Sequence, residues 1–195
     1  MWVLLDTNAY LRLAKRVCPL LGQPFGQKGY CLTILKAVEE EVWRSARLQE
    51  RYPWFDRPAL AAERLAKRVR PNRDEKAQLD AMQSVLRAHV LENVETYSQR
   101  HRSPPSPTDC YCLAFGQVRS AIVVTDDLGM HRLAAEFELP IWAGHELLKK
   151  MLTAKVVDRT LVIAIYEALE ANRDIDAGWR TAKHTAFKKI FGPKP

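Results

Sequence analysis

The stretch Trp2-Val3-Leu4-Leu5-Asp6-Thr7-Asn8 decides the fold of this 195-residue chain. Its first four residues are apolar and predict a buried β-strand, and Asp6 follows that strand directly. The stretch Ile122-Val123-Val124-Thr125-Asp126-Asp127 has the same pattern of an apolar strand followed by carboxylates. Ligands of open α/β sheets bind outside the carboxyl ends of the strands, so we expect these acids to meet at one edge of a parallel sheet.

Strand-like and helical segments alternate along the chain, which is typical of an α/β fold with a central parallel sheet covered by helices. The Gly- and Pro-rich residues 19–29 predict a loop. The expected elements are strands at residues 2–5, 30–33, 122–125 and 139–142, and helices at residues 8–17, from 35 to about 51, from 107 onward and at 128–137.

Two helical segments lie outside this alternation. Residues 58–101 are too long for a plain crossover and form a helical insertion, either as an arm or dimer surface or as cover for the core. From about residue 145 the chain is expected to be helical to its end. We therefore expect one main domain at residues 1–148, which contains the insertion, and a helical C-terminal extension at residues 149–195.

Composition and charge restrict the partners. The formal charge of +7 favours a polyanion such as RNA, and a basic surface without a partner is an equally good explanation of the charge alone. No apolar run reaches the roughly 18 residues of a membrane span and no secretory signal is recognisable, so we expect a cytoplasmic protein with no membrane partner. The four cysteines fit reduced, mostly buried thiols, and the spacing of Cys110 and Cys112 does not match a zinc site.

Each carboxylate motif has a structural alternative to a functional role. Asp6 and Asp127 are suited to capping the helices that follow them. The stretch Ser106-Pro107-Thr108-Asp109 matches a capping box. The run Glu39-Glu40-Glu41 resembles a solvated helical face.

One glutamate of this run shares the spacing of inward-facing residues. Glu41 lies three residues after Val38 and seven after Ile34, the offsets of one helical stripe. We therefore expect Glu41 to face the site, with Glu40 as the alternative.

In their order along the chain these motifs resemble the PIN domain family. The matching segments are Asp6-Thr7-Asn8 after the first strand, Val38–Val42 on the second helix, Thr108–Ala114 on a later helix and Val124–Asp127 after a later strand. The resemblance covers residues 1–148 apart from the insertion. It implies a three-layer α/β/α fold and a metal-dependent endoribonuclease, in which water activated by Mg²⁺ or Mn²⁺ hydrolyses RNA phosphodiester bonds.

The resemblance also implies the site residues and partners. Asn8 and Thr125 match accessory polar positions, and participation of Asp126 stays open. Members of the family often pair, which favours a homodimer, and toxin members bind an antitoxin protein. Residues 149–195 have no counterpart in the small toxin members. The catalytic residues and metal ligands that the resemblance implies are Asp6, Glu41, Asp109 and Asp127.

Other functions compete with this one. A phosphatase of the haloacid dehalogenase type needs a second aspartate where this chain has Asn8, and a receiver domain needs its acidic pair after the first strand. A catalytically silent module of the same fold, binding RNA or protein, is the serious alternative. For RNA contact we consider Trp179 and Phe187, which either stack on bases or pack the last helices, and these cations of the insertion and tail: Arg57, Arg64, Lys67, Arg68, Arg70, Arg73, Lys76, Arg180, Lys183, Lys188, Lys189 and Lys194.

Overall fold

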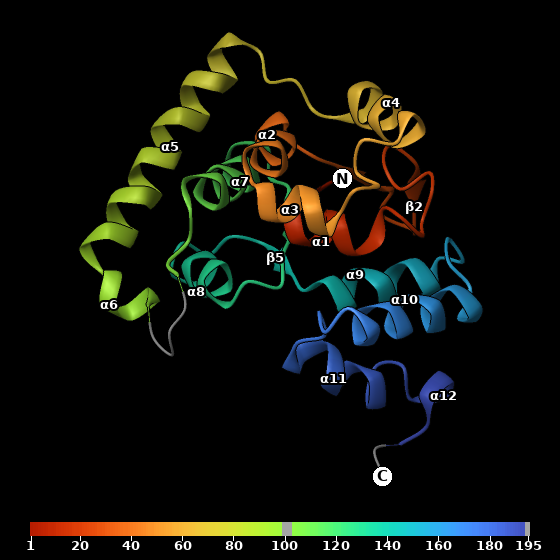
Figure 1. Cartoon of the computed structure of the whole chain (residues 1–195). Helices are drawn as coiled ribbons and strands as arrows, with labels where there is room; N and C mark the ends of the chain where they lie inside the picture. The colour runs from red at the N-terminus through yellow and green to blue at the C-terminus, as the bar shows by residue number, and fades with distance from the viewer. Residues whose placement is uncertain (99–102, 194–195) are drawn as a thin grey trace.

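A five-stranded sheet forms the centre of the computed structural model, which describes residues 1–98 and 103–193 (Figure 1). The strands lie in the order β2-β3-β1-β4-β5, and only β2 runs antiparallel to its neighbour. The α/β class and the mainly parallel sheet expected from the sequence are confirmed. The strands are β1 (Trp2–Leu5), β2 (Pro24–Phe25), β3 (Tyr30–Thr33), β4 (Ile122–Val124) and β5 (Ile141–Trp142).

Helices connect and cover the strands. They are α1 (Thr7–Leu13), α2 (Lys36–Arg44), α3 (Ala46–Arg51), α4 (Pro58–Lys67), α5 (Arg73–Glu92), α6 (Val94–Tyr97), α7 (Pro107–Val118), α8 (Leu128–Glu136), α9 (Gly144–Thr153), α10 (Arg159–Ala171), α11 (Ala177–His184) and α12 (Lys188–Phe191). Residues 99–101 of the expected insertion and residues 194–195 of the extension lie outside the described residues.

Three local expectations need correction. The predicted helix from 35 to about 51 is divided at Ser45, whose backbone is extended and whose hydroxyl caps α3 by accepting from the Leu48 N–H at 3.3 Å. The first helix ends at Leu13 instead of residue 17. The expected loop at residues 19–29 contains β2, because two residues are too few for a periodic signal and only pairing with β3 reveals them.

Side chains of the strands alternate between two apolar clusters, one on each face of the sheet. Val3 and Leu5 belong to the first cluster, which α1, α9, α10 and α11 complete. Leu4 and Val123 belong to the second, which α5, α7 and α8 complete. The C-terminal extension is therefore packed into the same core as the sheet, with Trp179 fully buried.

The insertion contributes to the core. Helix α5 buries Leu79, Leu86 and Val90 in the second cluster and lies against α7 (Figure 1). This contact supports the expectation of core cover for α5. Helix α4 contributes Leu60 to the first cluster and a buried arginine, Arg64, to the interior.

Membrane and cysteine expectations are partly met. In the described part of the chain no helix combines the length and apolarity needed to cross a bilayer. All four cysteines are free thiols, and Cys110 and Cys112 are buried in α7 as expected. Cys18 is exposed, contrary to the expectation of mostly buried thiols, because it lies in the loop after α1.

Candidate functional site

The neighbouring strands β1 and β4 bring the first candidate acids to one edge of the sheet. They are paired in parallel, and the Asp6 N–H donates to the Val124 carbonyl at 3.0 Å. Strand β3 lies on the far side of β1 and β5 lies beyond β4, so the order of the strands reverses between β1 and β4. Such a switch point leaves a crevice at the carboxyl edge, where open α/β sheets bind ligands.

Asp6 is buried, with only 3% of its surface exposed. Its Oδ1 caps α1 by accepting from the Ala9 N–H at 2.6 Å, and its Oδ2 accepts from the Thr125 hydroxyl. The Thr125 Oγ1 in turn accepts from the Asp127 N–H at 3.1 Å. Thr125 therefore links Asp6 to Asp127. A carboxylate has about four lone-pair positions, so these hydrogen bonds leave room for another ligand.

Asp109 and Asp127 also cap helices, as the structural alternative predicted. Asp109 forms a capping box with Ser106: its Oδ2 accepts from the Ser106 N–H at 2.7 Å, and its own N–H donates to the Ser106 hydroxyl at 3.1 Å. Asp127 caps α8 by accepting from the Met130 N–H at 2.8 Å. Capping fixes where these carboxylates lie, at the N-terminal ends of α7 and α8.

The buried glutamate of α2 is Glu39, whereas the helical spacing had selected Glu41. Glu39 is 3% exposed, and its carboxylate pairs with Arg64 at 3.3 Å and Arg68 at 2.8 Å. Arg64 is fully buried, and its guanidinium carbon lies 3.7 Å from the ring centroid of Phe55. Because both cations come from the insertion, the residues of α2 alone could not reveal them. The expectation that Arg64 contacts RNA is therefore wrong, because its side chain is buried.

Glu41 is half-buried and faces the carboxyl end of β1. Its Oε2 accepts from the Thr7 hydroxyl at 2.5 Å. Glu40 instead pairs along the helix surface with Lys36 at 2.9 Å and Arg44 at 3.2 Å. Of the two glutamates left open, Glu41 is the one connected to the residue that follows Asp6. The sequence motifs did not predict a site role for Thr7, although it lies in the matched segment Asp6-Thr7-Asn8.

The pKa values of the acids show that they lie within electrostatic reach of one another. Burial, reinforced by the charges of Asp109 and Asp126, raises the pKa of Asp6 to about 8. Burial, reinforced by the charges of Glu41 and Asp127, raises the pKa of Asp109 to about 6. Desolvation and like charges both disfavour the ionised form of a carboxyl group. The structure therefore brings acids from β1, α2, α7 and the β4–α8 turn to one region.

The four candidate acids differ from the acids beside them in having no ion pair within the part of the chain that the structure describes. Glu39, Glu40 and Asp126 each pair with at least one arginine or lysine. Among residues 1–98 and 103–193, no Lys, Arg or His nitrogen lies within 4.0 Å of the carboxylates of Asp6, Glu41, Asp109 or Asp127. Of the acids on α2, on α7 and after β1 and β4, the four that the sequence motifs select have no described countercharge, whereas Glu39, Glu40 and Asp126 have one.

Four carboxylates are suited to a hard divalent cation such as Mg²⁺ or Mn²⁺, which prefers oxygen ligands. As the described side chains are arranged, no three His, Cys, Asp or Glu groups lie close enough together to hold one ion. Mg²⁺ keeps several waters and usually takes only one or two carboxylates directly. The donor set therefore fits such an ion when some of the carboxylates act through water.

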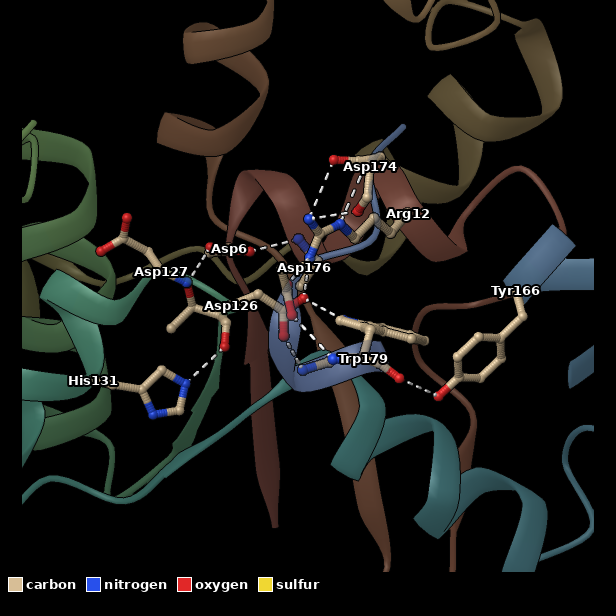
Figure 2. A network of polar contacts seen from close by, with 12 residues as sticks. Asp6, Arg12, Asp126, Asp127, His131, Tyr166, Asp174, Asp176 and Trp179 are labelled. Carbon is tan, nitrogen blue, oxygen red and sulfur yellow. Dashed lines mark hydrogen bonds and ion pairs between the residues drawn. The ribbon is translucent and has the colours of Figure 1, made fainter. Parts of the chain in front are cut away.

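Asp126 holds the C-terminal extension against the sheet (Figure 2). Its Oδ2 is bound by the Arg12 guanidinium and accepts from Trp179 Nε1 at 2.9 Å, while its Oδ1 accepts from the Gly144 N–H at 2.8 Å. A Cβ on Gly144 would lie 2.8 Å from Asp126 Oδ2 and 2.9 Å from the Trp179 ring, so this contact requires glycine. Asp126 therefore holds the extension in place, whereas Asp127 caps α8 and has no ion pair among the described residues.

Arg12 ties α1 to the segment before α11. It pairs with Asp126 and, at 3.2 and 3.3 Å, with Asp174 and Asp176 (Figure 2). Only 10% of its side chain is exposed. No local pattern predicts this network, because Arg12 is separated from each of its aspartate partners by more than one hundred residues. Trp179 and Phe187 are both buried, which confirms packing of the last helices and excludes their stacking on RNA bases.

Metal-free protein should lose stability as the pH rises from about 4 to about 8. The folded state keeps the Asp6 proton up to a pKa of about 8, whereas the unfolded chain releases it near 3.8, so the folded state binds more protons in this window. Asp109 adds to the effect up to about pH 6. Thermal unfolding in EDTA checks this: the melting temperature should fall between pH 5 and pH 8, and Asp6→Asn should flatten the fall. An equally steep fall in Asp6→Asn would contradict it.

Comparison with known proteins gives no relative from which a function could be transferred. No family model matches the chain, and neither a curated protein nor a solved structure matches it. The function must therefore be inferred from the residues at the carboxyl edge of the sheet.

Proposed function

We propose that this protein is a metal-dependent endoribonuclease of the PIN type, which hydrolyses RNA phosphodiester bonds. The observation that carries the proposal is the gathering of four acids without a described countercharge at the switch point of the sheet. Clustered carboxylates repel one another and destabilise the fold, and a divalent cation relieves that repulsion.

The fold supports the same proposal. A mainly parallel sheet with helices on both faces is compatible with the three-layer α/β/α architecture of PIN-like nucleases. In this interpretation residues 1–148 form the nuclease domain, and the helical insertion and the extension at residues 149–195 are additions to it. A homodimer and an antitoxin protein remain predictions from the family resemblance, and a cytoplasmic location remains a prediction from the sequence.

The residues of the site would divide the work. Asp6 and Asp109 would hold Mg²⁺ or Mn²⁺, with Glu41 and Asp127 acting directly or through water. A bound ion of this kind acidifies water and stabilises the charge that develops in phosphoryl transfer. Thr7 orients Glu41 and Thr125 orients Asp6. Asn8 is exposed in the first turn of α1, at the edge where the substrate would lie.

Titration with divalent ions tests this proposal. We expect a labelled single-stranded RNA to be cleaved with Mn²⁺ or Mg²⁺ and to stay intact in EDTA. At about 100 times its Kd the ion should add about 2.7 kcal/mol of stability, which raises the melting temperature by roughly 5–10 °C for a chain of this size. Absence of both cleavage and stabilisation would reject the proposal.

A catalytically silent module with the same fold is the second candidate. The observation in its favour is that Asp6, Asp109 and Asp127 already cap α1, α7 and α8, so each has a structural role. Such a module would bind RNA or a protein without cleaving it, and divalent ions would stabilise it little. The same titration therefore separates the two candidates.

A further inference from the structure

Two hollows of the surface join beside the proposed site. The first, which we call the acid hollow, has a volume of about 580 Å³ and is lined by Asp126 and Asp127. The second, which we call the lysine hollow, has a volume of about 650 Å³ and lies between α9 and α11. His145, Ala177 and Gly178 line both hollows, so the two adjoin, and we call them together the depression.

The charge of this depression reverses along its length. Three aspartates line the acid hollow, whereas Lys149 and Lys150 line the lysine hollow. The one carboxylate among the residues that line the lysine hollow belongs to Glu146, which caps α9 by accepting from the Ala143 N–H at 2.8 Å. Asp126 and Asp176 pair with Arg12, so Asp127 is the acid of the first hollow that belongs to the proposed site, and the lysine end is suited to phosphate.

The ammonium groups of the two lysines lie near aromatic rings, at cation–π distance. The Lys149 Nζ lies 5.6 Å from the ring centroid of Phe187, and the Lys150 Nζ lies 4.4 Å from that of Trp142. Within the described ranges 1–98 and 103–193, neither ammonium group has a carboxylate within 4.0 Å. An ammonium group has three N–H donors, so both lysines have donors to offer a phosphate.

Gly178 and His145 lie where the two hollows adjoin. A Cβ on Gly178 would lie 3.1 Å from Asp176 Oδ1 and 3.4 Å from His145 Cε1, so a larger residue at this position would crowd both side chains. The Nδ1 of His145 is buried and, among the described residues, has no hydrogen-bond partner.

We propose that this depression holds a single RNA strand on one side of the scissile phosphate, with two of its phosphates on Lys149 and Lys150. The inference rests on the nuclease function proposed above and adds a substrate-binding role for the C-terminal extension. A single strand fits because the lysine hollow has the size of pockets that enclose small ligands, about 300–1,000 Å³.

The salt dependence of RNA binding tests the proposed RNA path, by which we mean the course of the single strand through the depression over Lys149 and Lys150. Affinity of a fluorescein-labelled oligouridine is measured in EDTA, where no cleavage occurs, for the parent and for Lys149→Gln/Lys150→Gln. Two lost phosphate contacts should reduce the slope of log affinity against log salt by about 1.4, since each single-strand contact contributes about 0.7. The matched control is Lys15→Gln/Lys28→Gln, which changes net charge equally at exposed positions outside both hollows and outside the cations considered for RNA contact, and it should keep the parental slope.

The outcomes separate the path from the nuclease function. An unchanged slope in Lys149→Gln/Lys150→Gln, or an equal reduction in the control, overturns the path. A duplex RNA that loses as much slope as the single strand also overturns it. If the parent cleaves RNA with Mn²⁺ but the slope is unchanged, only the path falls. If the slope is reduced but the parent never cleaves, binding of the strand by the two lysines stands, and the nuclease function falls together with the placement beside a scissile phosphate. Melting temperatures of both double variants confirm folding.

Discussion

Asp6→Asn and Asp109→Asn should each lower metal-dependent RNA cleavage by at least about 100-fold, because even residues that only orient metal ligands contribute 10–100-fold. Asparagine keeps the size and the acceptor oxygen of the side chain and caps helices as well as aspartate does. Both changes also remove a carboxyl group whose pKa is raised, buried in the case of Asp6 and partly buried in the case of Asp109. Metal-free variants should therefore be folded and at least as stable as the parent.

Asp158→Asn is the matched control for these substitutions. Asp158 caps α10 by accepting from the Leu161 N–H at 2.7 Å, so it has the same structural role at an exposed position in the C-terminal extension. This variant should cleave RNA at the parental rate. Parental cleavage by both Asp6→Asn and Asp109→Asn would remove the acids from the mechanism.

The two adjacent glutamates of α2 extend the same comparison. Glu41→Gln should reduce cleavage by about 10–100-fold, as expected for loss of a group that holds or orients the ion. Glu40→Gln breaks only surface pairs with Lys36 and Arg44, which are worth little. It should leave both cleavage and stability unchanged. Unchanged cleavage in Glu41→Gln together with reduced cleavage in Glu40→Gln would show that the contact between Glu41 and Thr7 is structural only.

Arg12→Leu should destabilise the protein by about 3–5 kcal/mol, because removal of one partner leaves a buried charge without compensation. The side chain of Asp126 is only 7% exposed, and Arg12 is its cationic partner. Urea unfolding monitored by circular dichroism measures the change. Arg16→Leu is the control: Arg16 makes no ion pair among the described residues and its replacement should cost within about 0.5 kcal/mol.

A double-mutant cycle identifies the cause of this loss. If the uncompensated charge of Asp126 dominates, Arg12→Leu/Asp126→Asn should lose less stability than the sum of the single variants, with a coupling of about 0.5–3 kcal/mol. Strict additivity would show instead that Arg12 acts through Asp174 and Asp176 alone. Either way the cycle measures how firmly the extension is attached to the carboxyl edge of the sheet.

Local patterns were enough for the elements with a strong periodic signal. The apolar runs at Trp2–Leu5 and Ile122–Val124 are strands as expected, and the acids that follow them cap the next helices, as their chemistry predicts. The capping box of Ser106 and Asp109 was also legible in four residues. These features depend on neighbours in the chain, which a single sequence displays. Strand β2 was missed because its cause lies in pairing with β3. The break at Ser45 was missed because the apolar helical spacing continues from Val42 to Ala46 across the cap that its hydroxyl forms.

The sequence by itself determined the α/β class, the edge of the sheet where acids collect and the helix starts that they cap. Only the tertiary structure decided which acids receive a countercharge: Glu39 from the insertion, Asp126 from Arg12, and none described for Asp6 or Asp109. The physical reason is the distance along the chain over which each interaction acts. Capping and periodicity act within a few residues, whereas burial and ion pairing depend on groups brought together from distant parts of the chain by packing of the core.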